Sequence, residues 1–486
     1  MALGLFAACA CAFYAMLTQR PGMILDVDGL FHFKMARLIR EHGPWVDISQ
    51  LPFTVLGSKG PDHEWLFHLL LAPLTWLGSD LNALLLASAI AGAALAVFLY
   101  LLLQRAGAPC AALFALAAMF SGALLPARFI TLRAQDIAVA LMAASLFALA
   151  RRSTTWIAVI AFLFTEAYHA AVILGVLLAC TLAAQWIVER KVHTASITAI
   201  VLGVFAGLLA SPWFPDNVRY LLFHTLFKTT DANAALSGIE WAPMPFARIA
   251  VESWPAHLIL SSGLAALAVA ARRAGTRILG VDTLACCALT IVFLAMYRFA
   301  WRFAEYYGPF AVISGALLWR DALPHLQWQL RLRGALAAGL AVLVACGAFI
   351  GAQLVDRSLT RPFDLFRDMM SYVDAHDEKP MVLNSLWSDF QPMYYWSERA
   401  RFVAGLDGRY LLYGDPERFR VWNEISSGVA ASRTDNARRI RQTFGAQWVV
   451  LPRGHEAMAA ALARDPGARL ALETRDGWLY RLESSQ

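Results

Sequence analysis

The chain has 486 residues, of which 59% are hydrophobic and 16% charged, with a formal net charge of +6 and a mean hydropathy of +0.53. Soluble domains carry about 25% charged residues, so this composition excludes a wholly soluble protein. Apolar runs of about 17 to 25 residues, each long enough to cross a bilayer, recur before Pro362, and the sequence after it is polar. These features predict a polytopic α-helical membrane protein, with a transmembrane domain at 1–356 and a soluble α/β domain at 357–486.

Eleven apolar segments are candidate membrane spans. The short links that contain Arg105, Arg151 and Arg320 all fall on one side of the membrane, which the positive-inside rule makes cytoplasmic. An odd number of spans then places the N-terminus in the cytoplasm and the C-terminal domain outside it. The spans are expected at 2–18, 80–103, 107–124, 134–150, 154–167, 169–187, 195–211, 255–271, 278–296, 306–319 and 334–354.

The first outer loop, 19–79, is far longer than a connector requires, which is typical of functional loops. It contains Asp26 and Asp28, followed at 30–41 by apolar residues on one side of a helix and Lys34 with other cations on the opposite side. This pattern predicts a helix lying in the membrane interface. One of the two aspartates could merely cap that helix, but a closely spaced pair at a membrane surface favours a functional site.

Further carboxylates fall on the outer side. Asp136 opens a span, where burial of a charge is costly and therefore indicates function. The outer segment 212–255 contains Glu240, whose tryptophan and proline neighbours would hold it rigidly, although an ordinary solvated loop residue is an equal alternative; its other acids are Asp216, Asp231 and Glu252. Glu166 and His169, where two spans meet, could form a proton relay, but exposure to water at an outer turn is favoured.

Arginines on the same side require an explanation. They either reach toward lipid headgroups or hold an anionic ligand. Arg298 and Arg302 are four residues apart and are expected to share one helical face, which favours a ligand for these two. Arg128 and Arg133 are the next candidates for an anion site.

The soluble domain alternates short apolar runs with helical segments. Strands are predicted at 381–383, 402–404 and 448–451, and the helices lie between them, which indicates an α/β domain with a largely parallel sheet; the helices are expected near 390–396, 417–425, 434–444 and 456–464. The sequence contains no glycine-rich nucleotide motif and no zinc-protease motif. Its basic residues are scattered, so we expect no nucleic-acid partner.

Taken together, these features resemble the GT-C superfamily of integral-membrane glycosyltransferases, in particular the STT3/PglB-type oligosaccharyltransferase catalytic subunits and their bacterial relatives. The segment from Asp26 to Arg37 is similar to the family's first-loop motif, and 128–140 occupies the place of its arginine and of the acidic motif that opens the fourth span. The predicted number of spans is lower than the family's thirteen or so. Trp387-Ser388-Asp389 stands where the family has its Trp-Trp-Asp motif, so recognition of an Asn-x-Ser/Thr acceptor is not carried over.

The resemblance implies a reaction. A sugar would pass from a polyprenyl-phosphate-linked donor to a glycan, lipid or protein acceptor, on the outer face of a bacterial inner membrane. The acidic candidates for catalysis are Asp26, Asp28, Asp136 and Glu240, and Asp28 with Asp136 would hold a divalent metal ion, Mg²⁺ or Mn²⁺. The departing phosphate needs cations, for which the candidates are Arg298, Arg302, Arg128 and Arg133.

Two other classes of protein are compatible with this sequence. A transporter or flippase for an anionic lipid would also need outer cations and membrane carboxylates, but inverted repeats and helices broken near the midplane are not visible. A non-catalytic assembly subunit would use the soluble domain to bind a partner. A lipid-linked sugar transfer assay on an Asp28 variant discriminates among the three.

Overall fold

The structure is a computed structural model, and it describes residues 1–57, 59–227, 236, 238–274, 278–327, 329–358 and 360–483. Asp231, one of the acids considered above, lies outside the described residues. The chain divides into two compact units. The helical unit comprises Met1–Asp26, His63–Pro215 and Ile239–Thr360, and the sheet unit comprises Val27–Asp62, Asp216–Gly238 and Arg361–Gln486.

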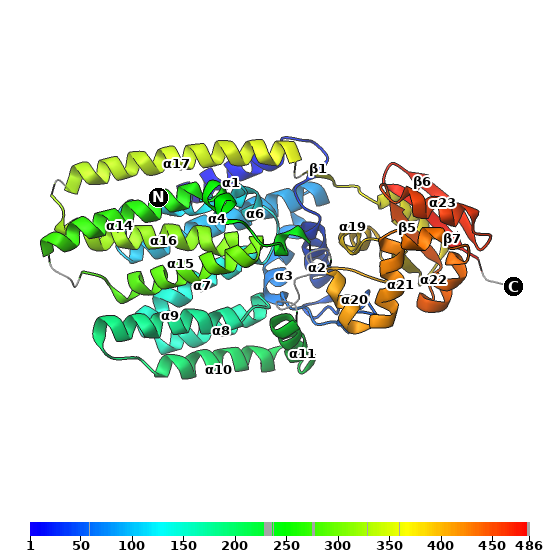
Figure 1. The fold of residues 1–486 in the computed structure, drawn as a ribbon, viewed down its shortest axis with the longest axis horizontal. Coiled ribbons are helices and arrows are strands. Elements are labelled where there is room, and N and C mark those ends of the chain that lie inside the picture. Colours follow the sequence, from blue (N-terminus) through cyan, green and yellow to red (C-terminus); the bar gives the residue numbers. More distant parts are fainter. Residues whose placement is uncertain are drawn as a thin grey trace. The chain divides into compact units, whose positions relative to one another are not determined.

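In the helical unit, long helices run side by side (Figure 1). A helix overlaps each of the eleven predicted spans: α1 (Ala2–Leu17), α4 (Asp80–Arg105), α5 (Ala111–Met119), α7 (Gln135–Ala150), α8 (Thr154–Ala167), α9 (Val172–Glu189), α10 (Ala195–Ala210), α14 (Trp254–Ala274), α15 (Val281–Phe299), α16 (Ala304–Ala322) and α17 (Gln329–Ser358). Within the described residues, five helices are long and apolar enough to cross a membrane, namely α4, α9, α14, α15 and α17.

Short elements lie in the connections between these helices. They are β1 (Met23–Ile24), α3 (Trp65–Leu71), η1 (Ala72–Trp76), α6 (Leu125–Phe129), η3 (Ile239–Trp241), α13 (Phe246–Glu252) and η4 (Trp301–Phe303), while η5 (Leu323–His325) follows α16. Backbones approach closely where α14 packs on α16. A Cβ at Gly263 would lie 3.0 Å from the carbonyl oxygen of Gly315, so glycine is needed at this crossing.

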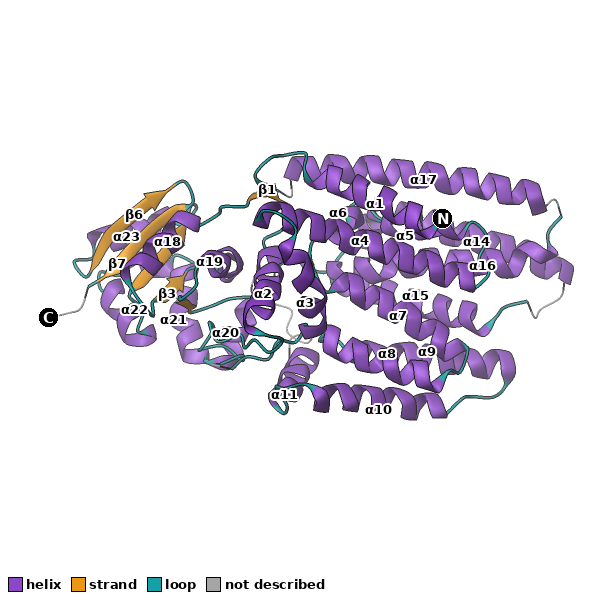
Figure 2. Cartoon of the chain, turned by 180° about the vertical axis from the view of Figure 1, so that it is seen from behind, coloured by secondary structure: helices purple, strands orange, loops and turns teal. Residues whose placement is uncertain are grey.

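The strands of the sheet unit are orange in Figure 2. They form a five-stranded sheet in the order β4-β3-β5-β7-β6. Its strands are β3 (Met381–Asn384), β4 (Arg401–Phe402), β5 (Trp448–Pro452), β6 (Ala468–Thr474) and β7 (Gly477–Leu482). β3 is parallel to β4 and β5, whereas β7 is antiparallel to β5 and β6. The sheet was predicted to be largely parallel, but it is mixed. The prediction did not include β6 and β7, and the two-residue link between these strands permits only an antiparallel pair.

Each face of this sheet has its own hydrophobic core. Side chains alternate between faces along a strand, so Val382 and Val450 face one core while Leu383 and Val449 face the other. Helices cover both faces: α2 (Asp28–His42), α11 (Asp216–Leu222), α18 (Arg367–His376), α19 (Phe390–Trp396), α20 (Gly408–Gly414), α21 (Pro416–Ser426), α22 (Asn436–Phe444) and α23 (Glu456–Arg464); the shorter elements are η2 (Phe223–Phe227), β2 (Arg361–Pro362), η6 (Trp387–Asp389) and η7 (Val429–Ser432).

The apolar face of the helix after Asp28, which was predicted to lie on the membrane surface, is buried within the sheet unit. α2 packs against α19, and its Phe31 and Met35 belong to the core cluster on one face of the sheet. Lys34, expected on a solvated face, is buried and donates hydrogen bonds to the carbonyl oxygens of Tyr394 and Ser397. Burial lowers the pKa of Lys34 to about 8. The apolar face of α2 therefore serves the core of the sheet unit.

Candidate active site

Four of the predicted site residues converge with Arg302 in the helical unit, although they come from distant parts of the chain. Asp26 follows β1, Arg128 lies on α6, Arg133 precedes α7, Glu240 lies on η3, and Arg302 lies on η4. We call these residues, together with Glu305 described below, the arginine–carboxylate network. Apart from Glu305, which lies in the first turn of α16, all belong to the segments that connect the long helices.

Glu240 is the centre of this network. Arg128 donates a hydrogen bond of 2.9 Å from Nη2 to Oε2 of Glu240, and Arg133 donates one of 3.5 Å from Nη1 to the same oxygen. Arg302 approaches the other oxygen, Oε1, at 3.4 Å. Burial by itself would raise the pKa of the Glu240 carboxyl, but the three guanidinium groups outweigh it and hold this pKa well below its usual range. Glu240 is therefore an anion fixed among three cations, and not a solvated loop residue.

The outer parts of the network hold the arginines in place. Arg133 also donates to Oδ2 of Asp26, and Arg128 donates from Nε to Oε1 of Glu305. Glu305 is the second residue of α16, and its side chain is only 4% exposed. Glu305 is not among the site residues predicted from the sequence, although it is, like Asp136, an acid at the start of a predicted span, where burial of a charge indicates function.

Asp136 lies beside this network. It is the second residue of α7 and is 4% exposed. Among the described residues, no donor forms a hydrogen bond with either of its carboxylate oxygens. A buried carboxyl group without such a partner is costly and points to a ligand or a proton.

Aromatic rings and a pocket adjoin the arginines. The guanidinium of Arg302 lies 4.7 Å from the ring centroid of Trp241, and that of Arg128 lies 5.9 Å from Trp301. A small pocket, with a cavity volume of about 10 Å³, lies next to them. Its walls combine apolar with charged residues: Gly122, Ala123, Leu124, Leu125, Arg128, Glu252, Ser253, Tyr297, Trp301, Arg302, Ala304 and Glu305.

Among the contacts of the described residues, none links Arg298 to the arginine–carboxylate network. α15 ends at Phe299, and Ala300 has an extended backbone (φ −150°, ψ 129°) before η4 begins. The helical face that Arg298 was expected to share with Arg302 therefore does not exist. The guanidinium of Arg298 lies instead 5.7 Å from the ring centroid of Phe246.

Asp28 belongs to the sheet unit, at the first position of α2. Gln391 Nε2 donates a hydrogen bond of 2.9 Å to its Oδ1. Asp26 and Asp28, which the sequence presents as a pair, thus have different surroundings, because the backbone passes from one unit to the other between them.

Glu166 and His169 lie where α8 gives way to α9. Glu166 is buried, with an exposed fraction of 6%, which contradicts the expectation that it faces water. Between them, Tyr168 is fully buried and its hydroxyl lies 2.7 Å from that of Tyr306. The electrostatic neighbours of Tyr168 include Arg302, Glu305 and Glu64, so this turn adjoins the arginine–carboxylate network.

The fold is that of GT-C glycosyltransferases. An oligosaccharyltransferase from Archaeoglobus fulgidus superposes with a TM-score of 0.65 at 13% identity, over 99% of this chain and 74% of that one. ArnT from Cupriavidus metallidurans in the apo state gives 0.60 at 17% identity, over 100% and 99%. The mycobacterial arabinofuranosyltransferase AftD gives 0.61 at 15% identity, over 99% and 40%. No family profile and no curated protein sequence matches the chain.

Proposed function

We propose that this protein is a membrane glycosyltransferase that transfers a sugar from a polyprenyl-phosphate-linked donor to an acceptor on the extracytoplasmic face. The arginine–carboxylate network beside a partly apolar pocket, in a GT-C fold, is the observation that carries this proposal. Glycosyl transfer leaves negative charge on the departing phosphate, and fixed guanidinium groups stabilise such charge. A transporter has no comparable support, because the similar structures named above are all glycosyltransferases.

Arg128 and Arg302 would hold the phosphate of the donor. Both line the pocket, together with the apolar residues Leu124 and Leu125. ArnT from Cupriavidus metallidurans has been solved with undecaprenyl phosphate bound, which makes a lipid phosphate the natural ligand to test. Arg133 would act on the phosphate only indirectly, because its guanidinium donates hydrogen bonds to Glu240 and Asp26.

Asp28 is proposed as the base that takes the proton of the acceptor, and Asp26 and Glu240 as the carboxylates that orient the arginines. A divalent ion, Mg²⁺ or Mn²⁺, bound through Asp28 and Asp136 is part of the proposal. The oxygen ligands of the two carboxylates suit such an ion, and the unsatisfied oxygens of Asp136 fit a ligand role. When bound, the ion would neutralise charge on the leaving phosphate.

The membrane arrangement is part of the same proposal. Eleven spans, with the N-terminus in the cytoplasm of a bacterial cell, would place the α/β domain at 357–486 and the whole arginine–carboxylate network on the outer side. The acceptor is a glycan, a lipid or a protein. One structure of the Archaeoglobus fulgidus enzyme carries a tethered acceptor peptide with an NVT sequon, but Trp387-Ser388-Asp389 in this chain gives no basis for choosing a peptide.

Asp28→Asn tests the proposal. The amide keeps the shape of the side chain and loses its charge, so turnover should fall by about 10²- to 10⁴-fold while expression and thermal stability stay close to wild type. Asp47→Asn is the matched control, because Asp47 is an exposed aspartate of the same unit. The measurement is transfer of labelled sugar from a polyprenyl-phosphate donor by purified protein. Wild-type turnover in Asp28→Asn would remove Asp28 from the mechanism.

A further inference from the structure

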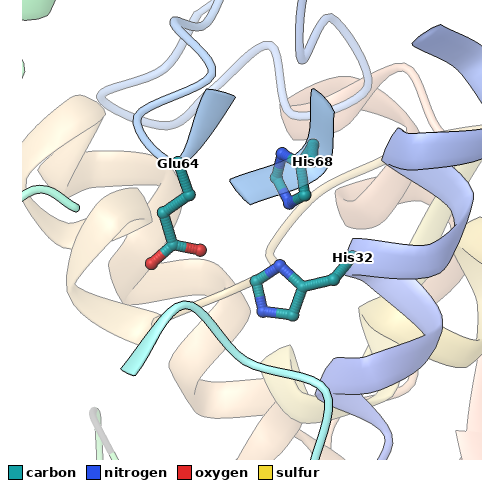
Figure 3. Close-up of side chains that lie close together, drawn as sticks. All are labelled: His32, Glu64 and His68. Carbon is teal, nitrogen blue, oxygen red and sulfur yellow. The ribbon is translucent and has the colours of Figure 1, made fainter. Parts of the chain in front are cut away.

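A second cluster of side chains lies in the helical unit, outside the arginine–carboxylate network. His63 and Glu64 precede α3, and His169 lies in the link between α8 and α9. One ligand atom from each of the three, an imidazole nitrogen or a carboxylate oxygen, lies within 4.8 Å of the other two. Figure 3 shows Glu64 just before α3 and His68 on it; His32, also drawn there, belongs to α2 of the sheet unit.

We propose that His63, Glu64 and His169 bind a transition-metal ion, with Zn²⁺ as the expected species. Two imidazoles and one carboxylate are the protein ligands of many zinc sites that keep a fourth position open. This donor set differs from the oxygen-only set that Mg²⁺ and Mn²⁺ prefer. The site is therefore chemically distinct from the divalent ion proposed for Asp28 and Asp136, and it does not depend on the transfer reaction.

The geometry of the cluster fits a zinc ion. Two ligand atoms about 2.0–2.1 Å from a tetrahedral ion lie about 3.3 Å from each other. Nδ1 of His169 and Oε1 of Glu64 are 3.3 Å apart. The rings of His63 and His169 meet edge to face, with centroids 5.3 Å apart, and one ring nitrogen of His63 lies within 4.8 Å of the other two ligand atoms.

The surroundings would hold the three ligands in place. Glu64 is 6% exposed and immediately precedes α3, and α3 packs against α8, whose C-terminal end leads to His169. The ring of Tyr168 lies 4.4 Å from the ring of His169. An ion at this site would therefore fasten the first outer loop to the link between α8 and α9, next to Tyr168 and its neighbour Arg302.

The test is metal content of the full-length protein purified in detergent. After dialysis against zinc and removal of loosely bound ions, we expect about one zinc ion per chain in the wild type and less than about 0.1 in His169→Ala. Glu64→Gln and His63→Gln, which keep the side-chain size, should each weaken zinc binding at least about 10-fold. His193→Ala is the control, because His193 lies far along the chain, in the link between α9 and α10.

Three results would overturn the proposal. They are a wild-type protein without tightly bound zinc, zinc content unchanged in His169→Ala and Glu64→Gln, or equal zinc loss in His193→Ala. Thermal shift with added ZnCl₂ is the second measurement, and it reports whether each variant is folded. Asp136→Asn and Arg302→Ala should retain zinc, so failure of the transferase proposal and failure of this one give different results.

Discussion

At the scale of single residues, Glu240 joins three arginines of the site to one carboxylate. Its carboxylate accepts from Arg128 and Arg133 and lies 3.4 Å from Arg302. Three cations around one anion leave an excess of two positive charges, which the carboxylates of Asp26 and Glu305 balance. The arginines are therefore held in fixed positions before any ligand arrives, which is the condition for stabilising charge that develops during a reaction.

Arg302 and Arg298 should differ in their effect on donor binding. Arg302→Ala removes a charge-assisted hydrogen-bond donor, worth about 1.5–3 kcal/mol, and should raise the KM for a polyprenyl-phosphate donor by about 10- to 100-fold. Lysine should rescue it only partly, because it lacks the planar fork of the guanidinium. Arg298→Ala is the matched control, because the structure places this side chain over Phe246. Equal effects of both changes on the donor KM would contradict the role given to Arg302.

At the scale of elements, the N-terminus of α19 contains a pH-dependent group. Asp389 precedes the helix without a side-chain capping hydrogen bond, and burial raises the pKa of its carboxyl to about 7. Because the folded protein holds this proton more tightly than the unfolded chain, stability declines as the pH rises from about 4 to 7 and then stays level.

Asp389→Asn should remove this decline. The variant should be more stable than the wild type at pH 8, by at most about 4 kcal/mol, and nearly equal to it at pH 4. The measurement is the Tm of the full chain in detergent as a function of pH, with the exposed Asp368→Asn as control. A constant difference in Tm across this range would rule out the titration of Asp389 as its cause.

The crossing of α14 and α16 depends on the absence of side chains. A Cβ added at Gly315 would lie 2.7 Å from Cγ2 of Ile259 and 3.0 Å from its carbonyl oxygen. Gly315→Ala should therefore force the two helices apart and cost about 1–3 kcal/mol. Gly339→Ala on α17, where nothing lies within 4 Å, should instead be neutral or stabilise by up to about 1 kcal/mol through helix propensity. Thermal unfolding of both variants in one detergent tests this difference in sign.

At the scale of the whole molecule, the proposed orientation is open to a direct test. A reporter that is active only in the periplasm should give signal when fused after Gln486. The same reporter fused after Arg190, in the link between α9 and α10, should stay silent, because that link is expected in the cytoplasm. The opposite pair of results would refute the outer-face reaction proposed for this protein.

Several properties were predicted correctly from local sequence. Membrane-length apolar runs coincide with helices such as α4 and α17, because hydropathy and helical hydrogen bonding are both properties of one segment. The helices at 390–396 and 456–464 were also predicted with the bounds that α19 and α23 have. The GT-C resemblance, drawn from the predicted topology together with two short motifs, agrees with the fold of the similar structures.

Only the tertiary structure decided which charges meet. Arg128 and Arg302 lie far apart in the sequence but pair with one carboxylate, Glu240, whereas Arg298, four residues from Arg302, lies over Phe246. The amphipathic pattern of α2 indicated that one face is buried, but the same pattern suits a membrane surface and a protein core equally well. Ion pairs between residues far apart in the sequence depend on how the elements pack, and no local periodicity of the sequence predicts them.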